Sequence, residues 1–318
     1  MTHSVSLDSV QAARDRIAKY VCRTPLEQAR WLSRNGEVFL KLECFQITGS
    51  FKLRGATAKL TALSEEEKNR GILSVSAGNH GLGLARAAKW LGLSATIVVP
   101  KTASPAKVEG IRRYGVNLIE RGTSYDEAER ASRALERQTE MTFVSPYNDP
   151  DVIAGQGTVA IEILEANPDI DAILVPVGGG GLLAGILVAA KAIKPDIKVY
   201  GVEPVATPTM TCALKAGEIV EVVEEPTIAD GLAGNIEPNS MTFPIIQKLV
   251  DGIILVDEAS ICRAMTDLAF NQHVITEGSA AAALAAVSDP RLNNLKVAAV
   301  LTGRNINLDL FLDVVGQY

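Results

Sequence analysis

Histidine and cysteine are scarce in this chain, which has three histidines and four cysteines among 318 residues. Cys22, Cys44, Cys212 and Cys262 form no Cys-x-x-Cys pair, so neither a structural zinc site nor a disulfide framework is expected. A metal centre built from several histidines is excluded for the same reason. Reduced thiols are typical of the cytoplasm, which is the location we predict.

Clustered positive charge is also missing. Lysine and arginine number 31 against 37 acidic residues, a net charge of −6 with no basic block. Neither a nucleic acid nor an anionic membrane surface is therefore expected as a partner. The first residues contain no basic stretch followed by an apolar run, so no signal peptide is expected either. This balance predicts a protein that acts on small molecules.

Residues 172–190 form a run without charge, AILVPVGGGGLLAGILVAA, of about the length that spans a membrane. Pro176 and four glycines interrupt the run, and Asp171 and Lys191 bound it. A strand, a glycine loop and a buried helix explain this pattern better than a transmembrane helix.

Short β-rich runs alternate with amphipathic or alanine-rich segments. The runs are ILSV, ATIVV, NLIE, AILVPV, KVYGVE, GIILVD and KVAAV. Apolar strands that alternate with helices are typical of parallel sheets covered on both faces. A capping box, Ser124 to Glu127, begins the helix predicted after NLIE. The fold class is therefore α/β, with more strands than a single sheet would comfortably hold.

Three turns follow predicted strands, where ligands collect in an open parallel sheet. They are SAGNHGLG (76–83), GGGGLLAG (178–185) and LTGRN (301–305). Four consecutive glycines favour phosphate binding at the start of the next helix, although tight strand-to-helix packing is the alternative. No Gly-Lys-Ser/Thr follows, so the turn is not a Walker A loop.

The first of these turns permits two other interpretations. Gly81 and Gly83 fit part of a dinucleotide pattern, but the next strand ends in Lys101 instead of an acidic residue, which weakens a nicotinamide dehydrogenase. His80 is expected to form a hydrogen bond within its loop and not to catalyse, since no Gly-x-Ser-x-Gly elbow is present.

Lys52 stands between Phe51 and Leu53 in GSFKLRGA. One interpretation is a lysine at a helix start whose ammonium reaches solvent. The other is a desolvated amine kept reactive for Schiff-base chemistry. With a phosphate loop, Asn79 and the hydroxyl of Thr302, the second interpretation supplies what a pyridoxal phosphate site requires.

The motifs TGSFKLRGA, SAGNHGLGLA, VGGGGLLAG, IADGLAG and EGSAAAALA resemble those of the serine/threonine dehydratase and serine racemase family. The resemblance runs from RTPL (Arg23–Leu26) to LTGRN. It implies pyridoxal phosphate as cofactor and fold type II, which is tryptophan-synthase β-like, with parallel or mixed twisted sheets covered by helices. It also implies a large cofactor-binding domain, 1–70 and 149–318, and a small substrate-gating domain, 71–148.

The resemblance also implies a role for each matching residue. Lys52 is the catalytic residue, which bonds the cofactor aldehyde and removes the Cα proton. The residues implied around the cofactor are Phe51 beside the ring, Asn79 on the ring hydroxyl, Gly178, Gly179, Gly180 and Gly181 on the phosphate, Gly231 and Glu277 near the ring, and Thr302 at the pyridine nitrogen. Those implied at the substrate carboxylate are Ser76, Gly78, Asn79 and His80.

The reaction implied is dehydration of an L-β-hydroxy amino acid, such as threonine or serine, to a 2-oxo acid and ammonia. A neutral hydroxyl at Thr302 leaves the ring nitrogen unprotonated, which favours elimination over transamination. Racemases of the family carry a serine where this chain has Ala77, so little racemisation is expected. The alternatives are a serine racemase, or a dehydratase for a bulkier or acidic hydroxy amino acid, such as 3-hydroxyaspartate or one derived from hydroxyectoine.

Two departures from the family pattern matter. Relatives that bind a divalent cation use a glutamate, here Glu203, and a carboxylate six residues later, where this chain has Thr209, so no metal is predicted. Arg304 replaces the usual small residue and either faces the cofactor or lies at the surface. Family habit implies a homodimer or homotetramer, and no C-terminal regulatory domain is expected. A synthase of the same fold and a non-catalytic cofactor-binding protein stay open.

Overall fold

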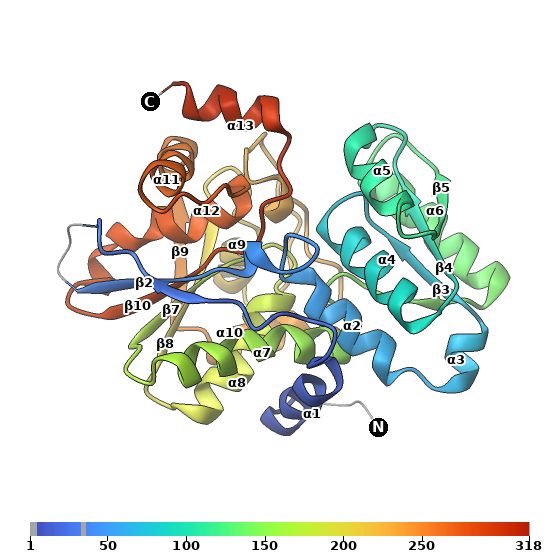
Figure 1. Cartoon of the computed structure of the whole chain (residues 1–318), viewed down its shortest axis with the longest axis horizontal. Helices are drawn as coiled ribbons and strands as arrows, with labels where there is room; N and C mark the ends of the chain where they lie inside the picture. The colour runs from blue at the N-terminus through green and yellow to red at the C-terminus, as the bar shows by residue number, and fades with distance from the viewer. Residues whose placement is uncertain (1–4, 33–35, 318) are drawn as a thin grey trace.

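The chain folds into two lobes, each built on its own β-sheet (Figure 1). The structure is a computed structural model that describes residues 5–32 and 36–317, apart from the side chains at 106, 125 and 126. The predicted α/β class is confirmed.

The larger sheet has six strands in the order β1-β2-β10-β7-β8-β9. All neighbouring pairs are parallel except β1 and β2, which are antiparallel. Its strands are β1 (Leu26–Gln28), β2 (Glu37–Lys41), β7 (Ala172–Pro176), β8 (Lys198–Pro204), β9 (Gly252–Val256) and β10 (Lys296–Val300).

Helices cover both faces of this sheet because its strands are apolar on both sides. In β10, Ala298 and Val300 pack into one core, whereas Val297 and Ala299 pack into the other. The helices on the first face are α1 (Leu7–Ile17), α7 (Pro150–Ala166), α8 (Gly181–Ile193), α9 (Thr209–Ala216) and α10 (Thr242–Leu249). Those on the second face are α11 (Glu258–Asn271), α12 (Gly278–Ala285) and α13 (Leu308–Val315).

The smaller sheet is parallel and has four strands in the order β5-β4-β3-β6. Its strands are β3 (Ile72–Val75), β4 (Ala95–Val99), β5 (Asn117–Glu120) and β6 (Thr142–Phe143). The helices associated with this lobe are α2 (Lys52–Ala62), α3 (Glu65–Asn69), α4 (Asn79–Leu91), α5 (Pro105–Arg112) and α6 (Tyr125–Thr139). The short 3-10 helices of the chain are η1 (Glu43–Phe45), η2 (Asp230–Leu232), η3 (Ala286–Ser288) and η4 (Pro290–Leu292).

Helix α2 joins the two lobes, since it packs on both α4 and α7. The contact with α7 is close because Gly55 and Gly155 face each other: a Cβ added at Gly155 would lie 2.8 Å from the Gly55 Cα. The small sheet falls within the range 71–148, but α2 contributes Leu53 and Leu60 to the same core. The division into two domains at those boundaries stays a prediction.

The apolar run of residues 172–190 forms β7, a glycine turn and α8, as the sequence predicts. Across the described residues, no helix combines the length and apolar character that crossing a membrane requires. The predicted capping box of α6 is half formed. Ser124 accepts a hydrogen bond from the Glu127 backbone, but the Glu127 carboxylate accepts from Thr123, one residue earlier than predicted.

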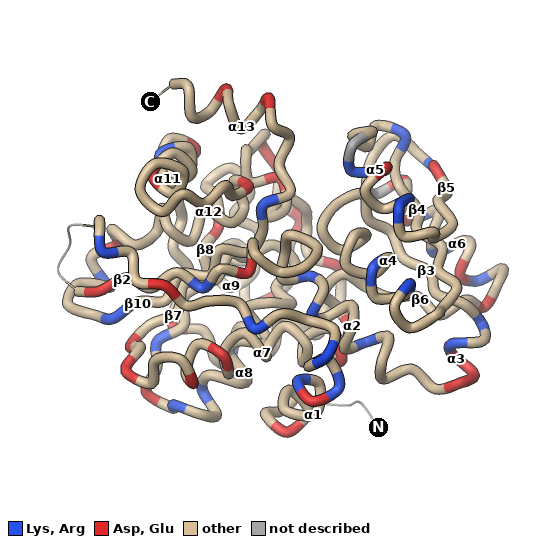
Figure 2. The backbone as a smooth tube through the Cα atoms, viewed as in Figure 1, with Lys and Arg blue, Asp and Glu red and all other residues tan. Residues whose placement is uncertain are grey.

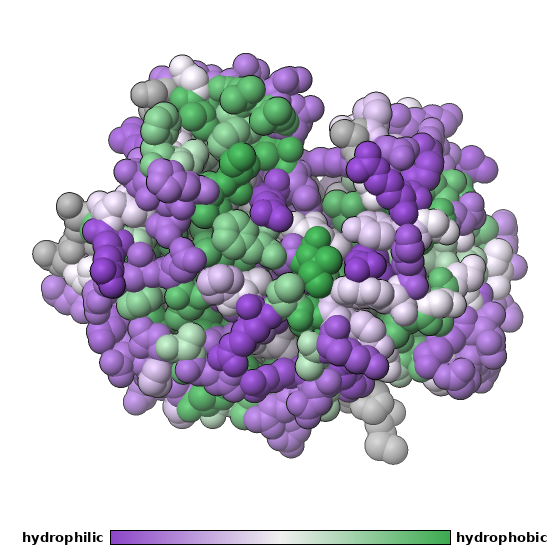
Figure 3. Space-filling view, viewed as in Figure 1, coloured by the Kyte–Doolittle hydropathy of each residue, from purple (hydrophilic) through white to green (hydrophobic). Residues whose placement is uncertain are grey.

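Basic and acidic positions are interspersed along the backbone of both lobes (Figure 2). Apolar side chains gather at the top of the larger lobe, where Figure 1 places α13 (Figure 3). This helix buries Phe311 and Val314 and leaves Leu308, Leu310 and Leu312 exposed.

Candidate active site

A cavity of about 660 Å³ lies between the two lobes, where strands of both sheets end. Such a volume suits a small-molecule or cofactor site. All predicted site residues line it: Phe51, Lys52, Ser76, Gly78, Asn79, His80, Gly178, Gly179, Gly180, Gly181, Gly231, Glu277 and Thr302. The structure therefore brings together residues that are up to 251 positions apart in the sequence, from Phe51 to Thr302.

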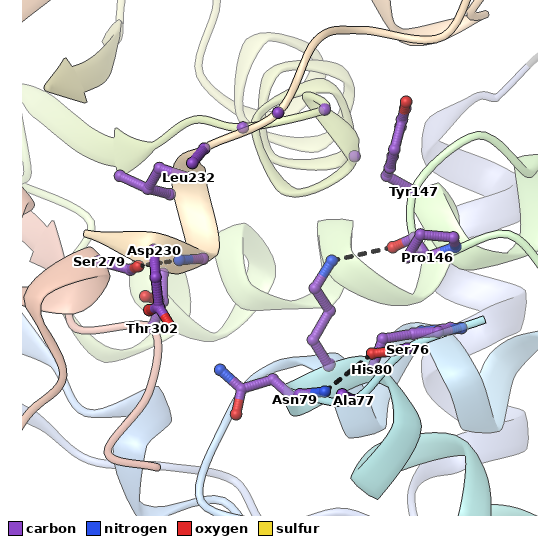
Figure 4. A pocket seen from close by; sticks show the side chains of 18 of the residues that line it. Ser76, Ala77, Asn79, His80, Pro146, Tyr147, Asp230, Leu232, Ser279 and Thr302 are labelled. Atoms are coloured by element: carbon purple, nitrogen blue, oxygen red, sulfur yellow. Dashed lines mark hydrogen bonds between the residues drawn. The ribbon is translucent and has the colours of Figure 1, made fainter. Parts of the chain in front are cut away.

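Lys52 is the first residue of α2, and its side chain turns into the cavity. Its Nζ donates a hydrogen bond to the Pro146 carbonyl at 3.0 Å (Figure 4) and lies 5.2 Å from the centre of the Phe51 ring. Burial lowers the pKa of Lys52 to about 8, although the charge of Glu277 opposes this shift. The half-buried side chain thus faces the cavity, and about half of the amine is neutral near pH 8.

Glu277 and Asn79 form a polar part of the cavity lining. Asn79 Nδ2 donates to Glu277 Oε1 at 2.7 Å, and the Asn79 Oδ1 accepts from Asn305 at 2.6 Å. Burial first, and then the charge of Asp230, raise the pKa of Glu277 to about 7. Its carboxyl group can thus gain or lose a proton near neutral pH.

The four glycines connect β7 to α8, and at three of them the structure requires glycine for a local reason. A Cβ at Gly179 or Gly181 would lie 2.5 Å or 2.8 Å from Tyr147, and Gly180 has a φ of +87°. Tight packing, the alternative to phosphate binding, therefore does account for some of the glycines. This packing does not exclude phosphate binding, because the first N–H groups of α8 have no acceptor within the helix and can donate to an anion.

The loop 76–79 leads into α4, whose N-cap is Gly78. The Gly78 N–H donates to Ser76 Oγ at 3.2 Å. The start of this 13-residue helix favours an anion through its free N–H groups and its dipole. Ala77 places a methyl group in the loop, which can neither give nor take a proton.

His80 forms its hydrogen bond outside its own loop, contrary to the prediction. Its Nε2 lies 3.1 Å from the Ser74 hydroxyl on β3, and the ring is 3% exposed. Burial, together with the charge of Lys52, lowers the pKa of His80 to about 3. The imidazole is therefore neutral, and its part in substrate binding stays a prediction.

Thr302 lies on the side of the cavity formed by the large sheet (Figure 4), and Gly231 also lines the cavity. Thr302 follows the end of β10 by two residues, and its carbonyl accepts from the Phe51 N–H at 3.0 Å, which ties this segment to the loop before Lys52. The Gly231 N–H donates to Ser279 Oγ at 2.9 Å.

An ion pair crosses the mouth of the cavity. Lys107 of α5 lies 3.1 Å from Asp230 of η2, so it joins the smaller lobe to the larger one. Sequence reasoning missed both residues, and it also missed Tyr147 and Asn305. Asp230 belongs to the quoted motif IADG and Asn305 to LTGRN, whereas nothing in the sequence marked Tyr147 or Lys107.

Glu203 and Arg304 resolve the two departures. The Glu203 carboxylate is fully buried and accepts hydrogen bonds from the Met210 and Thr211 N–H groups at 2.7 and 2.9 Å, so it caps α9. In the ranges 5–32 and 36–317, no three acidic, His or Cys side chains gather as a metal site would require. Arg304 is exposed outside the cavity, with its guanidinium 5.4 Å from the centre of the Phe45 ring.

The site fits pyridoxal phosphate on its own geometry. It offers an amine of lowered pKa for the aldehyde, a helix start with a glycine turn for the phosphate, and a buried hydroxyl at a strand end. The turn at Gly178 is open to the cavity, and a Cβ there would contact the Leu232 backbone at 3.3 Å.

Comparisons with known proteins agree with this fit. The family model described as pyridoxal-phosphate dependent enzyme matches residues 17–303. The L-threonine ammonia-lyase of Thermotoga maritima is 41% identical over 320 residues, which cover 98% of this chain and 79% of that protein. The threonine deaminase isoform 2 of Solanum lycopersicum has a similar structure, with a TM-score of 0.93, 34% identity and coverage of 98% and 88%. Maize serine racemase has a TM-score of 0.91, 34% identity and coverage of 99% and 98%.

Proposed function

Because this chain belongs to the family of pyridoxal-phosphate dependent enzymes, we propose that it is an L-threonine or L-serine ammonia-lyase that forms a 2-oxo acid and ammonia. The observation that carries the proposal is the Lys52 amine, which is desolvated, lines the cavity and has no carboxylate of the described residues in a close ion pair with it. The name of the Thermotoga relative supports the reaction.

Bound pyridoxal phosphate would withdraw electrons from the substrate Cα and so supply the chemistry that amino-acid side chains lack. The residues that would hold it are Lys52 at the aldehyde, Asn79 at the ring hydroxyl, Thr302 at the ring nitrogen and the glycine turn 178–181 at the phosphate. Phe51 would lie beside the ring, with Gly231 and Glu277 close to it.

Lys52 would act as the general base. A neutral amine can take the Cα proton, and a pKa of about 8 places its change of charge close to working pH. Glu277, with a pKa of about 7, is close enough for its charge to affect Lys52, so it can help to hold or return a proton.

The substrate carboxylate would bind at the start of α4, along the loop that contains Ser76, Gly78, Asn79 and His80. Further carboxylates line the cavity, from Glu129, Glu224 and Glu237. They disfavour an acidic side chain on the substrate, and Arg304 lies too far out to offset them. Among the alternatives, a neutral hydroxy amino acid is therefore favoured over 3-hydroxyaspartate.

Serine racemase is the second candidate, because solved racemases are similar over the whole chain. Racemisation needs a group that can deliver a proton to the opposite face of Cα. The methyl of Ala77 cannot do so, which favours elimination.

The visible spectrum of the purified protein, with and without L-threonine or L-serine, tests the proposal. We expect a yellow band that Lys52→Ala abolishes, 2-oxo acid that accumulates with ammonia, and almost no D-serine. Abundant D-serine would favour the racemase, and ammonia released only with a second substrate would favour a synthase. No band after addition of pyridoxal phosphate would overturn the proposal.

Two coarser expectations accompany this function. A homodimer or homotetramer stays a prediction that light scattering can check, and so does a cytoplasmic location.

A further inference from the structure

Asn305 touches three separate parts of the candidate site. Its Nδ2 donates to the Thr48 carbonyl at 2.8 Å and to Asn79 Oδ1 at 2.6 Å. Its backbone N–H stabilises the charged form of Glu277. The contact with the loop before Lys52 is tight, since a Cβ at Gly49 would lie 2.6 Å from Asn305 Oδ1.

These bonds fix which way each amide points. A backbone carbonyl only accepts, so Thr48 requires the NH₂ group of Asn305. That NH₂ group in turn requires the oxygen of Asn79, which leaves the Asn79 NH₂ to donate to Glu277 at 2.7 Å. Rotating Asn79 by half a turn would set its oxygen against the Glu277 carboxylate and its NH₂ against that of Asn305. Both contacts would lose a hydrogen bond.

We infer that Asn305 is a positioning residue, which holds the Asn79 carboxamide with its NH₂ group on the Glu277 side of the cavity and locks this orientation to the loop that carries Lys52. The inference rests on the proposed function, in which Asn79 donates to the ring hydroxyl. It adds that the Asn79 NH₂ group is available to the ring hydroxyl because the side-chain amide of Asn305, which is not part of that contact, fixes the orientation of Asn79.

The first test is Asn305→Asp, which keeps the shape but replaces the donor by an acceptor. The new carboxylate would repel the Thr48 carbonyl and would favour the rotated Asn79. We expect the apoprotein to lose several degrees of melting temperature. After addition of pyridoxal phosphate, we expect the visible band to shift, the cofactor affinity to fall about tenfold, and kcat to fall by a larger factor than KM rises.

Asn307→Asp is the matched control. It makes the same change of charge two residues later, where Asn307 caps α13 through bonds to the Asp309 and Leu310 N–H groups. Aspartate caps a helix as well as asparagine does. This variant should leave the melting temperature, the band and kcat unchanged.

The decisive test adds Glu277→Gln to Asn305→Asp. The amide introduced at position 277 can donate to the oxygen of a rotated Asn79, so the double variant should regain most of the melting temperature that Asn305→Asp loses. The band and the cofactor affinity should stay altered beyond the effect of Glu277→Gln alone, because the Asn79 donor still points away. A merely structural role for Asn305 would let both properties recover together, or neither.

Three results would overturn the inference: an unchanged band in Asn305→Asp, no regain of stability in the double variant, or equal recovery of stability and band. Should Asn305→Asp not fold, Asn305→Ala removes the donor without adding charge and should shift the band in the same direction. Failure of the proposed function is distinguishable. In that case the wild type shows no band at all, whereas the melting temperatures of the apoproteins still report on the Asn79 orientation.

Discussion

Helix α2 carries two cations only two residues apart, the half-buried Lys52 and the fully buried Arg54, and their surroundings differ in one respect, the pairing of the charge. Arg54 is 0% exposed, and its guanidinium donates to both Glu43 and Glu162 at 2.7–2.8 Å. Lys52 donates to the Pro146 carbonyl at 3.0 Å, and among the described residues Glu277 acts on it through its charge and not through a close ion pair.

The pKa values show the consequence of this difference. Burial lowers the pKa of Arg54, but Glu43 and Glu162 outweigh burial and raise it overall. Burial dominates at Lys52 and brings its pKa to about 8. Full pairing thus locks a charge into the fold, whereas incomplete pairing leaves an amine that can lose its proton and react.

The paired cation belongs to a larger neutral cluster. Lys41 of β2 joins Glu162 of α7, so two cations and two carboxylates lie together in the interior. The cluster ties β2, α2 and α7 to one another directly behind the start of α2. Desolvation offsets much of the attraction within such a cluster, but breaking it leaves buried charges unpaired.

The largest effect is expected where the unpaired amine is removed. Lys52→Ala should lower kcat by about 10⁴-fold, equal to about 5.5 kcal/mol of transition-state stabilisation, and abolish the visible band. The melting temperature of the apoprotein should stay equal or rise, because a buried amine is lost. Steady-state kinetics and thermal denaturation measure both.

Lys59→Ala is the control on the same helix. Lys59 forms an ion pair with Asp149 at 2.8 Å, away from the cavity lining. The Lys59→Ala variant should keep its catalytic activity and lose a little of its unfolding free energy. Catalytic turnover that persists in Lys52→Ala would contradict the proposed difference between Lys52, a reactive amine, and Lys59, an ion-paired lysine.

Removing the paired cation should produce the reverse pattern. Arg54→Met leaves the Glu43 and Glu162 carboxylates without their main partner, which should cost about 3–5 kcal/mol of unfolding free energy. Urea denaturation of the apoprotein measures this loss. Adding Glu43→Gln should recover part of it, since one buried charge disappears. A loss below about 1 kcal/mol would mean that the cluster is not a structural unit.

The carboxyl groups of the two regions should respond to pH in opposite directions. The pKa of Glu277 rises from 4.5 to about 7, so between these values the folded state binds more protons than the unfolded state. The stability of the apoprotein relative to Glu277→Gln should therefore fall as pH rises from 5 to 8, by about 2 kcal/mol.

Glu162 gives the opposite sign. Burial would raise its pKa, but Arg54 and Lys41 outweigh burial and lower it. Its contribution to stability is therefore present above its unfolded pKa and is lost as pH falls further. Denaturation of Glu162→Gln and Glu277→Gln across pH 3.5–8 should show slopes of opposite sign relative to wild type. If the stability of both variants changed with pH in the same direction, the distinction between the paired cluster around Arg54 and the region around Lys52 would be contradicted.

Much of this site could be predicted from the sequence because its parts are local. Four glycines after an apolar strand, and a lysine at a helix start, carry their meaning within a few residues. The orientation of Asn79, the contact of Tyr147 with the glycine turn and the pair of Lys107 with Asp230 join distant segments. Only the packing of the two lobes creates those contacts, so no spacing in the sequence could reveal them.

Glu203 illustrates why a missing ligand can mislead. Thr209 stands where a second carboxylate would be needed, which argues against a cation but says nothing about the groups that Glu203 binds instead. In the structure the start of α9 lies against Glu203, and two backbone N–H groups donate to its carboxylate. Burial raises the pKa of the carboxyl group even so, and hydrogen bonds limit the shift.

The smallest effect is expected at Arg304, which is a third kind of cation, exposed and stacked near Phe45. Arg304→Ala should cost at most about 0.5–1 kcal/mol of stability, the worth of an exposed cation–π contact. It should leave kcat/KM for threonine within about twofold, since the side chain is outside the cavity. Comparing threonine with 3-hydroxyaspartate sharpens the test. If only the acidic substrate loses kcat/KM, the guanidinium reaches the substrate during turnover, and exposure in the unliganded protein would be a poor guide to which cations serve the site.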